Sequence, residues 1–118
     1  MMDYSIIKIP RLKASVIRSA EYLLSHHPKT LRRVVLFGSC AKGTAVDGSD
    51  IDICCIFDNG TSLVSKDMRI FKANLRDIDF VDKDIIVCNV CHLQHPDMLI
   101  YHEINRTGIT LLDFSHLI

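Results

Sequence analysis

Hydrophobic positions recur along this chain in two rhythms, one typical of helices and the other of strands. Apolar residues spaced three and four apart predict helices, and short apolar runs bounded by turn residues predict buried strands. Helices are expected at Arg11 to His27 before Pro28, at Val64 to Leu75 with Ser62 as a cap, and from Pro96 to Gly108. Strands are expected at Val34 to Phe37, Ile51 to Phe57, Phe80 to Val87 and Ile109 to Leu112. The mixture predicts a domain of the α/β or α+β class.

The composition fits one domain that spans residues 1–118. Of the 118 residues, 48% are hydrophobic, which is enough for one core. Fourteen Lys and Arg balance fourteen Asp and Glu, so no basic field is available to hold an extended nucleic acid, and phosphate binding must be local. The chain shows no apolar run of membrane-spanning length and no export signal, and its five cysteines lack regular spacing. We therefore expect a cytoplasmic protein with no membrane contact.

The most informative segment runs from Leu36 to Ile53 and begins with a glycine turn after a buried strand. Gly38 lets the backbone turn sharply, and Ser39 adds a hydroxyl where a helix could start. Exposed amides in such a turn would face a phosphate. Gly43 supplies a second permissive position, and Lys42 could add a positive charge near the same phosphates. These residues are compatible with a nucleotide-binding turn, but Gly-Ser turns are common in proteins, so this half alone does not distinguish such a turn from an ordinary one.

The second half of the segment carries a pair of carboxylates. Asp50 and Asp52 stand two apart at the start of a strand, so they point from one face, roughly 6.5 Å apart at the backbone. A divalent cation would relieve their repulsion, and hard oxygen ligands suit Mg²⁺ or Mn²⁺. A third carboxylate on an adjacent strand would complete a site for two ions, and Asp84 is our choice, with Asp82 as the alternative. Taken alone, Ser49 to Asp52 would better fit an ordinary polar turn that leads into a half-buried strand.

At these residues the sequence resembles the minimal nucleotidyltransferase family of the DNA polymerase beta-like superfamily. The hallmark of that family is Gly-Ser, ten intervening residues, and Asp-x-Asp. Gly38-Ser39 and Asp50-Ile51-Asp52 fit that spacing, and seven positions in all match the wider pattern: Gly38, Ser39, Ala41, Gly43, Ser49, Asp50 and Asp52. The resemblance implies a mixed sheet flanked by helices, a triphosphate held at the glycine-serine turn, and two magnesium ions held by three aspartates. Family members follow the third aspartate directly with an apolar run, which favours Asp84 over Asp82.

The resemblance also implies an activity and a partner. The expected reaction moves a nucleoside monophosphate, AMP from ATP, onto an acceptor hydroxyl. The expected acceptor is a tyrosine of a helical HEPN-type toxin, which this chain would neutralise as the antitoxin of the pair. Two alternatives remain: a non-catalytic antitoxin that works by contact alone, and a small-molecule adenylyltransferase of the aminoglycoside type. The sequence leaves the acceptor, the base preference and a homo-oligomeric state open.

Two groups of residues outside the hallmark have more than one interpretation. Phe114, Leu117 and Ile118 either dock a partner near the active site or fold back onto the core of this domain, and the helix from Met98 to Ile104 is the other candidate docking surface. The pair Arg32 and Arg33 fits a solvated strand entry, although one of the two could reach phosphate.

Overall fold

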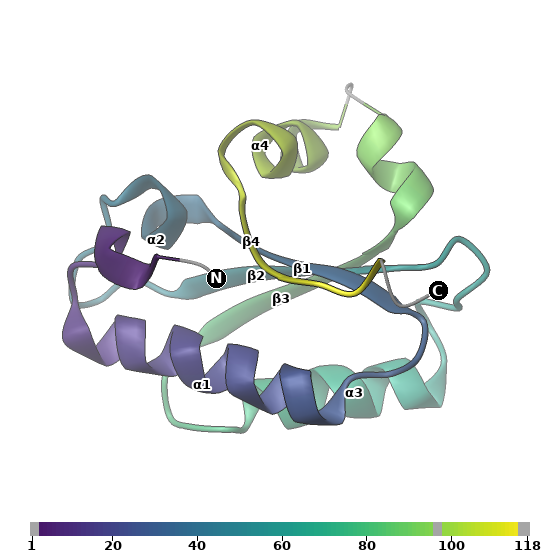
Figure 1. The fold of residues 1–118 in the computed structure, drawn as a ribbon, viewed down its shortest axis with the longest axis horizontal. Helices are drawn as coiled ribbons and strands as arrows, with labels where there is room; N and C mark the ends of the chain where they lie inside the picture. Colours follow the sequence, from purple (N-terminus) through teal and green to yellow (C-terminus); the bar gives the residue numbers. More distant parts are fainter. Residues whose placement is uncertain (1–2, 96–97, 116–118) are drawn as a thin grey trace.

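A four-stranded sheet separates two layers of helices in the computed structural model, which describes residues 3–95 and 98–115. Its strands are β1 (Leu31–Phe37), β2 (Ile51–Phe57), β3 (Lys83–Asn89) and β4 (Ile109–Asp113). Its helices are α1 (Pro10–His26), α2 (Gly38–Lys42), α3 (Lys66–Arg76) and α4 (Leu99–Thr107), with the 3₁₀ helices η1 (Tyr4–Ile6) and η2 (Val90–Gln94). Helices α1 and α3 cover one face of the sheet, and α4 lies over the other (Figure 1).

The sheet is mixed, as predicted. Its strand order is β3-β2-β1-β4, with β2 parallel to β3 and β1 antiparallel to both of its neighbours. A parallel pair needs a crossover between its strands, and α3 supplies it. Both β2 and β3 therefore begin at the same end of the sheet, which brings residues 50–52 and 82–84 side by side.

Strands β1, β2 and β3 contribute residues to two cores, one on each face of the sheet, because successive side chains point to opposite sides. Toward α1 and α3 the sheet directs Leu36, Ile51, Ile53, Cys55, Phe57 and Ile85. Toward α4 it directs Val35, Phe37, Cys54, Ile56 and Cys88, which pack with Ile104. We call this second surface the α4 face. Asp52 and Asp84 have the same parity as its apolar residues and therefore belong to it.

The predicted elements are present, with shifted boundaries at several places. Strand β2 has the predicted limits, while α1 starts one residue early, at Pro10, whose fixed φ suits a first turn. The cap of α3 is Ser65, whose Oγ accepts from Met68 N at 3.1 Å, so the expected cap at Ser62 was wrong. The expected first turn at Pro96 lies outside the described residues.

The third strand starts at Lys83 and not at Phe80, which is fully exposed. The cause is an ion cluster just before the strand. Asp79 accepts from Arg18 of α1 at 2.8 Å and from the buried Lys83 ammonium at 2.5 Å, and Lys83 also donates to Val81 O at 2.9 Å. Burial opposes the charge of Asp79, but these donors hold the pKa of that carboxyl well below its usual range. The cluster ties the start of β3 to α1.

At the end of β4, Phe114 is buried and stacks on His27 with ring centroids 3.9 Å apart. Phe114 thus folds back onto this domain, whereas Leu117 and Ile118 lie outside the described residues. No helix in the described part of the chain is long and apolar enough to cross a membrane.

Candidate active site

Two of the predicted acids face each other across parallel strands. Asp52 of β2 is in register with Asp84 of β3, and on its other side it pairs with Phe37, the last residue of β1. Asp82 lies one residue before β3, where its carbonyl accepts from Ile51 N at 3.1 Å. The register therefore sets Asp84, and not Asp82, beside Asp52.

The carboxylates are close enough to perturb one another. Asp52 is half-buried, while Asp50 and Asp84 are exposed. Burial, followed in order by the neighbouring charges of Asp84, Asp50 and Glu103, raises the pKa of Asp52 to about 6. The ammonium of Lys42 works in the opposite direction. The chain thus gathers negative charge at one end of the α4 face.

A glycine turn lies directly against this charge. Strand β1 ends at Phe37, and Gly38 opens the short helix α2 with a φ of 71°. A Cβ on residue 38 would come within 2.9 Å of Asp52 Cγ and closer still to Oδ2, so only glycine fits. Helix α2 ends at Gly43, which has a left-handed φ of 75° and donates its N–H to Ser39 O. The predicted sequence of strand, glycine turn and helix is confirmed.

Lys42 and Ser49 both have protein partners. Lys42 Nζ pairs with Glu103 Oε1 of α4 at 2.9 Å, which joins α2 to α4. Ser49 Oγ accepts from Val46 N at 2.9 Å and closes the turn that leads into Asp50. Sequence reasoning missed Glu103, because no local pattern indicates which face of α4 meets α2. Arg33, by contrast, lies four residues before Phe37 on β1, roughly 13 Å from the turn, and does not face it.

The three acids lie on one face of the sheet, but their side chains are not arranged around a single metal position. Among residues 3–95 and 98–115, no three Asp, Glu, His or Cys side chains are close enough to hold a metal ion as they stand. Their chemistry nevertheless fits a divalent cation. The three donors are carboxylate oxygens, and the pKa of Asp52 is raised first by burial and then by repulsion from Asp84 and Asp50, which a cation would relieve. Because Asp50 and Asp84 are exposed, a rotamer change could bring them together at small energetic cost.

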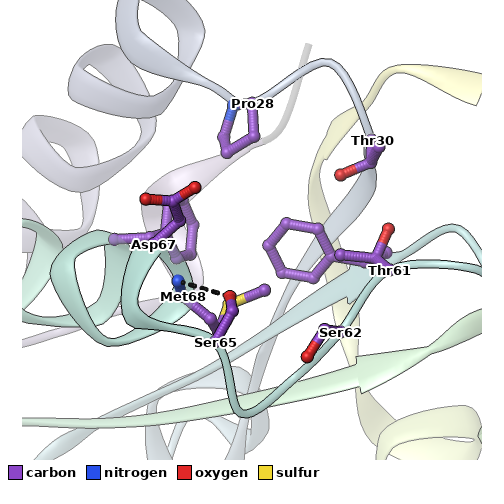
Figure 2. Close-up of a pocket in the computed structure, with 9 residues that line it drawn as sticks. Pro28, Thr30, Thr61, Ser62, Ser65, Asp67 and Met68 are labelled. Atoms are coloured by element: carbon purple, nitrogen blue, oxygen red, sulfur yellow. Dashed lines mark hydrogen bonds between the residues drawn. The ribbon is translucent and has the colours of Figure 1, made fainter.

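A hollow of about 240 Å³ at the opposite end of the sheet does not belong to this site (Figure 2). Its lining includes Thr30, Phe57, Thr61 and Ser62, together with residues at the start of α3. Figure 2 shows the capping bond from Met68 N to Ser65 Oγ at its edge. None of the hallmark residues lines it. The candidate active site is therefore the open end of the α4 face.

Comparison with known proteins shows the family to which the fold belongs. The family model described as nucleotidyltransferase domain matches residues 16–106, which include the turn, the three acids and Glu103. No curated protein sequence matches the chain closely enough to count as a relative.

Solved structures share the fold at low sequence identity. A proposed nucleotidyltransferase from Sulfolobus solfataricus superposes with a TM-score of 0.61 at 20% identity, over 96% of this chain and 90% of that one. A toxin–antitoxin structure with AMP-PNP gives a TM-score of 0.53 at 22% identity, over 87% of this chain and 74% of that one. A mutant of the toxin–antitoxin pair MntA–HpeT gives 0.52 at 20% identity, over 88% and 77%. These structures share the mixed sheet with its flanking helices.

Proposed function

Because the chain belongs to the nucleotidyltransferase domain family, we propose that it transfers AMP from ATP to a hydroxyl of a separate protein, as the antitoxin of a toxin–antitoxin pair. The observation that carries the proposal is the contact of Asp52 with both Gly38 and Asp84. It sets a phosphate turn and two carboxylates at one end of the sheet. Among the structural neighbours, one toxin–antitoxin structure contains AMP-PNP, which supports ATP as the donor.

The proposed chemistry is displacement at the α-phosphorus. The acceptor oxygen forms a bond to that phosphorus, the bond to the β-phosphate bridging oxygen breaks, and pyrophosphate leaves. Asp50, Asp52 and Asp84 would hold two Mg²⁺ or Mn²⁺ ions, which when bound would neutralise phosphate charge and acidify the acceptor hydroxyl. Asp84 is exposed and could accept the proton of that hydroxyl.

The other hallmark residues would hold the triphosphate. The N–H groups at the start of α2, which begins with Gly38 and Ser39, have no carbonyl acceptor within the helix. They can therefore donate hydrogen bonds to phosphate oxygens. Lys42 is 45% exposed and has three donor hydrogens, so it can contact a phosphate while it remains near Glu103. Ser49 would act indirectly, because its hydroxyl fixes the turn before Asp50.

A protein acceptor is supported by the surface beside the acids. Helix α4 lies over the same face of the sheet, and its first residue, Leu99, is 86% exposed, with Met98 before it at 49%. Exposed apolar side chains at a helix start are a common feature of protein docking surfaces. A helical HEPN-type toxin is the partner that the family resemblance implies.

Mass spectrometry of the partner tests this function. The chain is incubated with ATP, Mg²⁺ and the product of the neighbouring reading frame. The expected result is a partner that gains the mass of AMP with the wild-type chain and not with Asp52→Asn. A matched control, Asp67→Asn, changes an exposed acid of α3 away from the site and should leave the mass gain intact. Tight binding of the partner without any mass gain would contradict the transferase proposal and favour a non-catalytic antitoxin that acts by contact alone.

A further inference from the structure

A second cavity lies on the α4 face, at the end of the sheet away from the acids. It has a volume of about 280 Å³ and is lined by Arg32, Arg33, Ile56, Asp58, Val90, Leu93 and Ser115. Arg33 is in register with Ile56, four rows of paired residues beyond the row that contains Asp52. The cavity is therefore separated from the candidate active site by roughly 13 Å of sheet. None of the residues assigned to nucleotidyl transfer lines it.

The two arginines of this cavity are in different electrostatic states. Arg32 forms a two-pronged ion pair with Asp58, in which Nη2 lies 2.5 Å from Oδ2. Arg33 takes part in none of the ion pairs among the described residues, and its Nε is buried without a hydrogen-bond partner there. A buried guanidinium N–H without an acceptor is unfavourable, because its hydrogen bond to water is lost and no hydrogen bond within the protein replaces it. The cavity thus contains one guanidinium that forms no ion pair among the described residues, with Asp113 of β4 in register beside it.

The remaining lining defines what this charge would bind. Ile56 is buried and Leu93 packs into the α4-side core, so the floor beside Arg33 is apolar, and Val90 lies 37% exposed at the rim. Asp58 also lines the cavity, and its negative charge is already matched by Arg32. A group with two or more negative charges would meet a single guanidinium without an ion pair, and it would lie close to the carboxylates of Asp58 and Asp113. A monoanion with an apolar body matches both the charge and the surface.

We propose that this cavity is a binding site for a small monocarboxylic acid with an aliphatic body, whose carboxylate bonds Arg33. The guanidinium fork fits a carboxylate by two parallel hydrogen bonds, and the aliphatic part packs on Ile56 and Leu93. The cavity volume suits a small molecule of this kind and is too small for a folded peptide segment. The site is independent of the nucleotidyl transfer proposed above.

Binding of 4-methylpentanoate to the full chain, followed by NMR chemical shifts without ATP, tests the proposal. The largest chemical-shift changes are expected at Arg33, Ile56 and Leu93. The uncharged amide of the same acid, 4-methylpentanamide, should bind at least about tenfold more weakly. Arg33→Met, which keeps the apolar stem, should weaken carboxylate binding by a similar factor, whereas Arg69→Met on the exposed side of α3 should not. Equal binding of acid and amide, or unchanged binding by Arg33→Met, would overturn the proposal.

Two further ligands distinguish a carboxylate site from an unselective anion site and from a protein-docking surface. Inorganic phosphate that binds as tightly as the carboxylate would show an unselective anion site and overturn the assignment. Tighter binding of the peptide acetyl-Leu-Glu-Leu-amide would reassign the cavity to protein docking. Should Arg33→Met fail to fold, as judged by circular dichroism, Val90→Trp keeps the arginine and narrows the rim. It should then reduce binding about tenfold, and undiminished binding would equally overturn the proposal.

Discussion

The carboxylate of Asp52 occupies the space that a side chain on Gly38 would need. The two residues are fourteen positions apart, yet a Cβ on residue 38 would lie 2.9 Å from Asp52 Cγ and 3.3 Å from its Cβ. This contact connects the turn that would hold phosphate to the acid that would hold metal. The geometry of each depends on the other.

Gly38→Ala should therefore disturb both stability and function. The φ of 71° is strained for alanine, and the added methyl would push Asp52 away, so we expect a loss of about 2 kcal/mol or more in the free energy of unfolding. Urea denaturation measures this loss. Gly60→Ala is the matched control, since nothing lies within 4 Å of a Cβ built there, and its change should be within about 0.5 kcal/mol. Similar losses for both variants would contradict the contact.

Asp52→Asn should stabilise the metal-free chain at pH 8 while it removes activity. The folded pKa of Asp52 is raised from 3.8 to about 6, so the folded state binds a proton more tightly than the unfolded state. Stability is therefore lost as the pH rises from about 4 to 6, and the charged form remains unfavourable above that range. After allowance for solvent screening, the gain from Asn is about 1 kcal/mol, or roughly 4 °C in Tm.

Thermal denaturation in chelator, across pH 4 to 8, checks this prediction. The advantage of Asp52→Asn over wild type should shrink toward zero as the pH falls to 4. A stability difference that does not change with pH, or a variant less stable than wild type at pH 8, would show that the charged form of Asp52 does not destabilise the fold.

Asp84→Asn should abolish nucleotidyl transfer, and Asp82→Asn should retain most of it. Asp84 is in register with Asp52, whereas Asp82 precedes the strand and contributes its backbone carbonyl to Ile51 N. The rate of AMP incorporation into the partner distinguishes them, with Asp82→Asn as the matched control. Reversed activities would move the third metal ligand to Asp82.

Asp79→Asn should strongly lower the free energy of unfolding, although the Asp79 side chain is partly exposed. It leaves the buried Lys83 ammonium without a charged partner and releases Arg18, for an expected loss of about 3 kcal/mol. Asp77→Asn, an exposed neighbour, is the control and should be nearly neutral. Urea denaturation decides, and equal stability of the two variants would contradict the anchoring of β3.

The sequence predicted the parts of the site that lie close together in the chain. The spacing from Gly38 to Asp52 indicated the turn and the acid pair because one hairpin carries both. The start of β3 was misplaced because periodicity cannot show that Lys83 is held by Asp79. Glu103 was missed because its approach to Lys42 depends on how α4 packs on the sheet. The sequence favoured a strand entry for Arg32 and Arg33 and left open that one of them reaches phosphate, but the place of Arg33 on β1 sets it at the other end of the sheet.

The central claim is that Asp50, Asp52 and Asp84 bind a metal-bound triphosphate against the Gly38 turn. Isothermal titration calorimetry with the non-hydrolysable analogue AMP-PNP, in Mg²⁺ and then in chelator, tests it most directly. The account predicts binding that is at least about tenfold tighter with Mg²⁺ for the wild-type chain, and no metal effect for Asp52→Asn. Equal affinity with and without Mg²⁺ in the wild-type chain would contradict it.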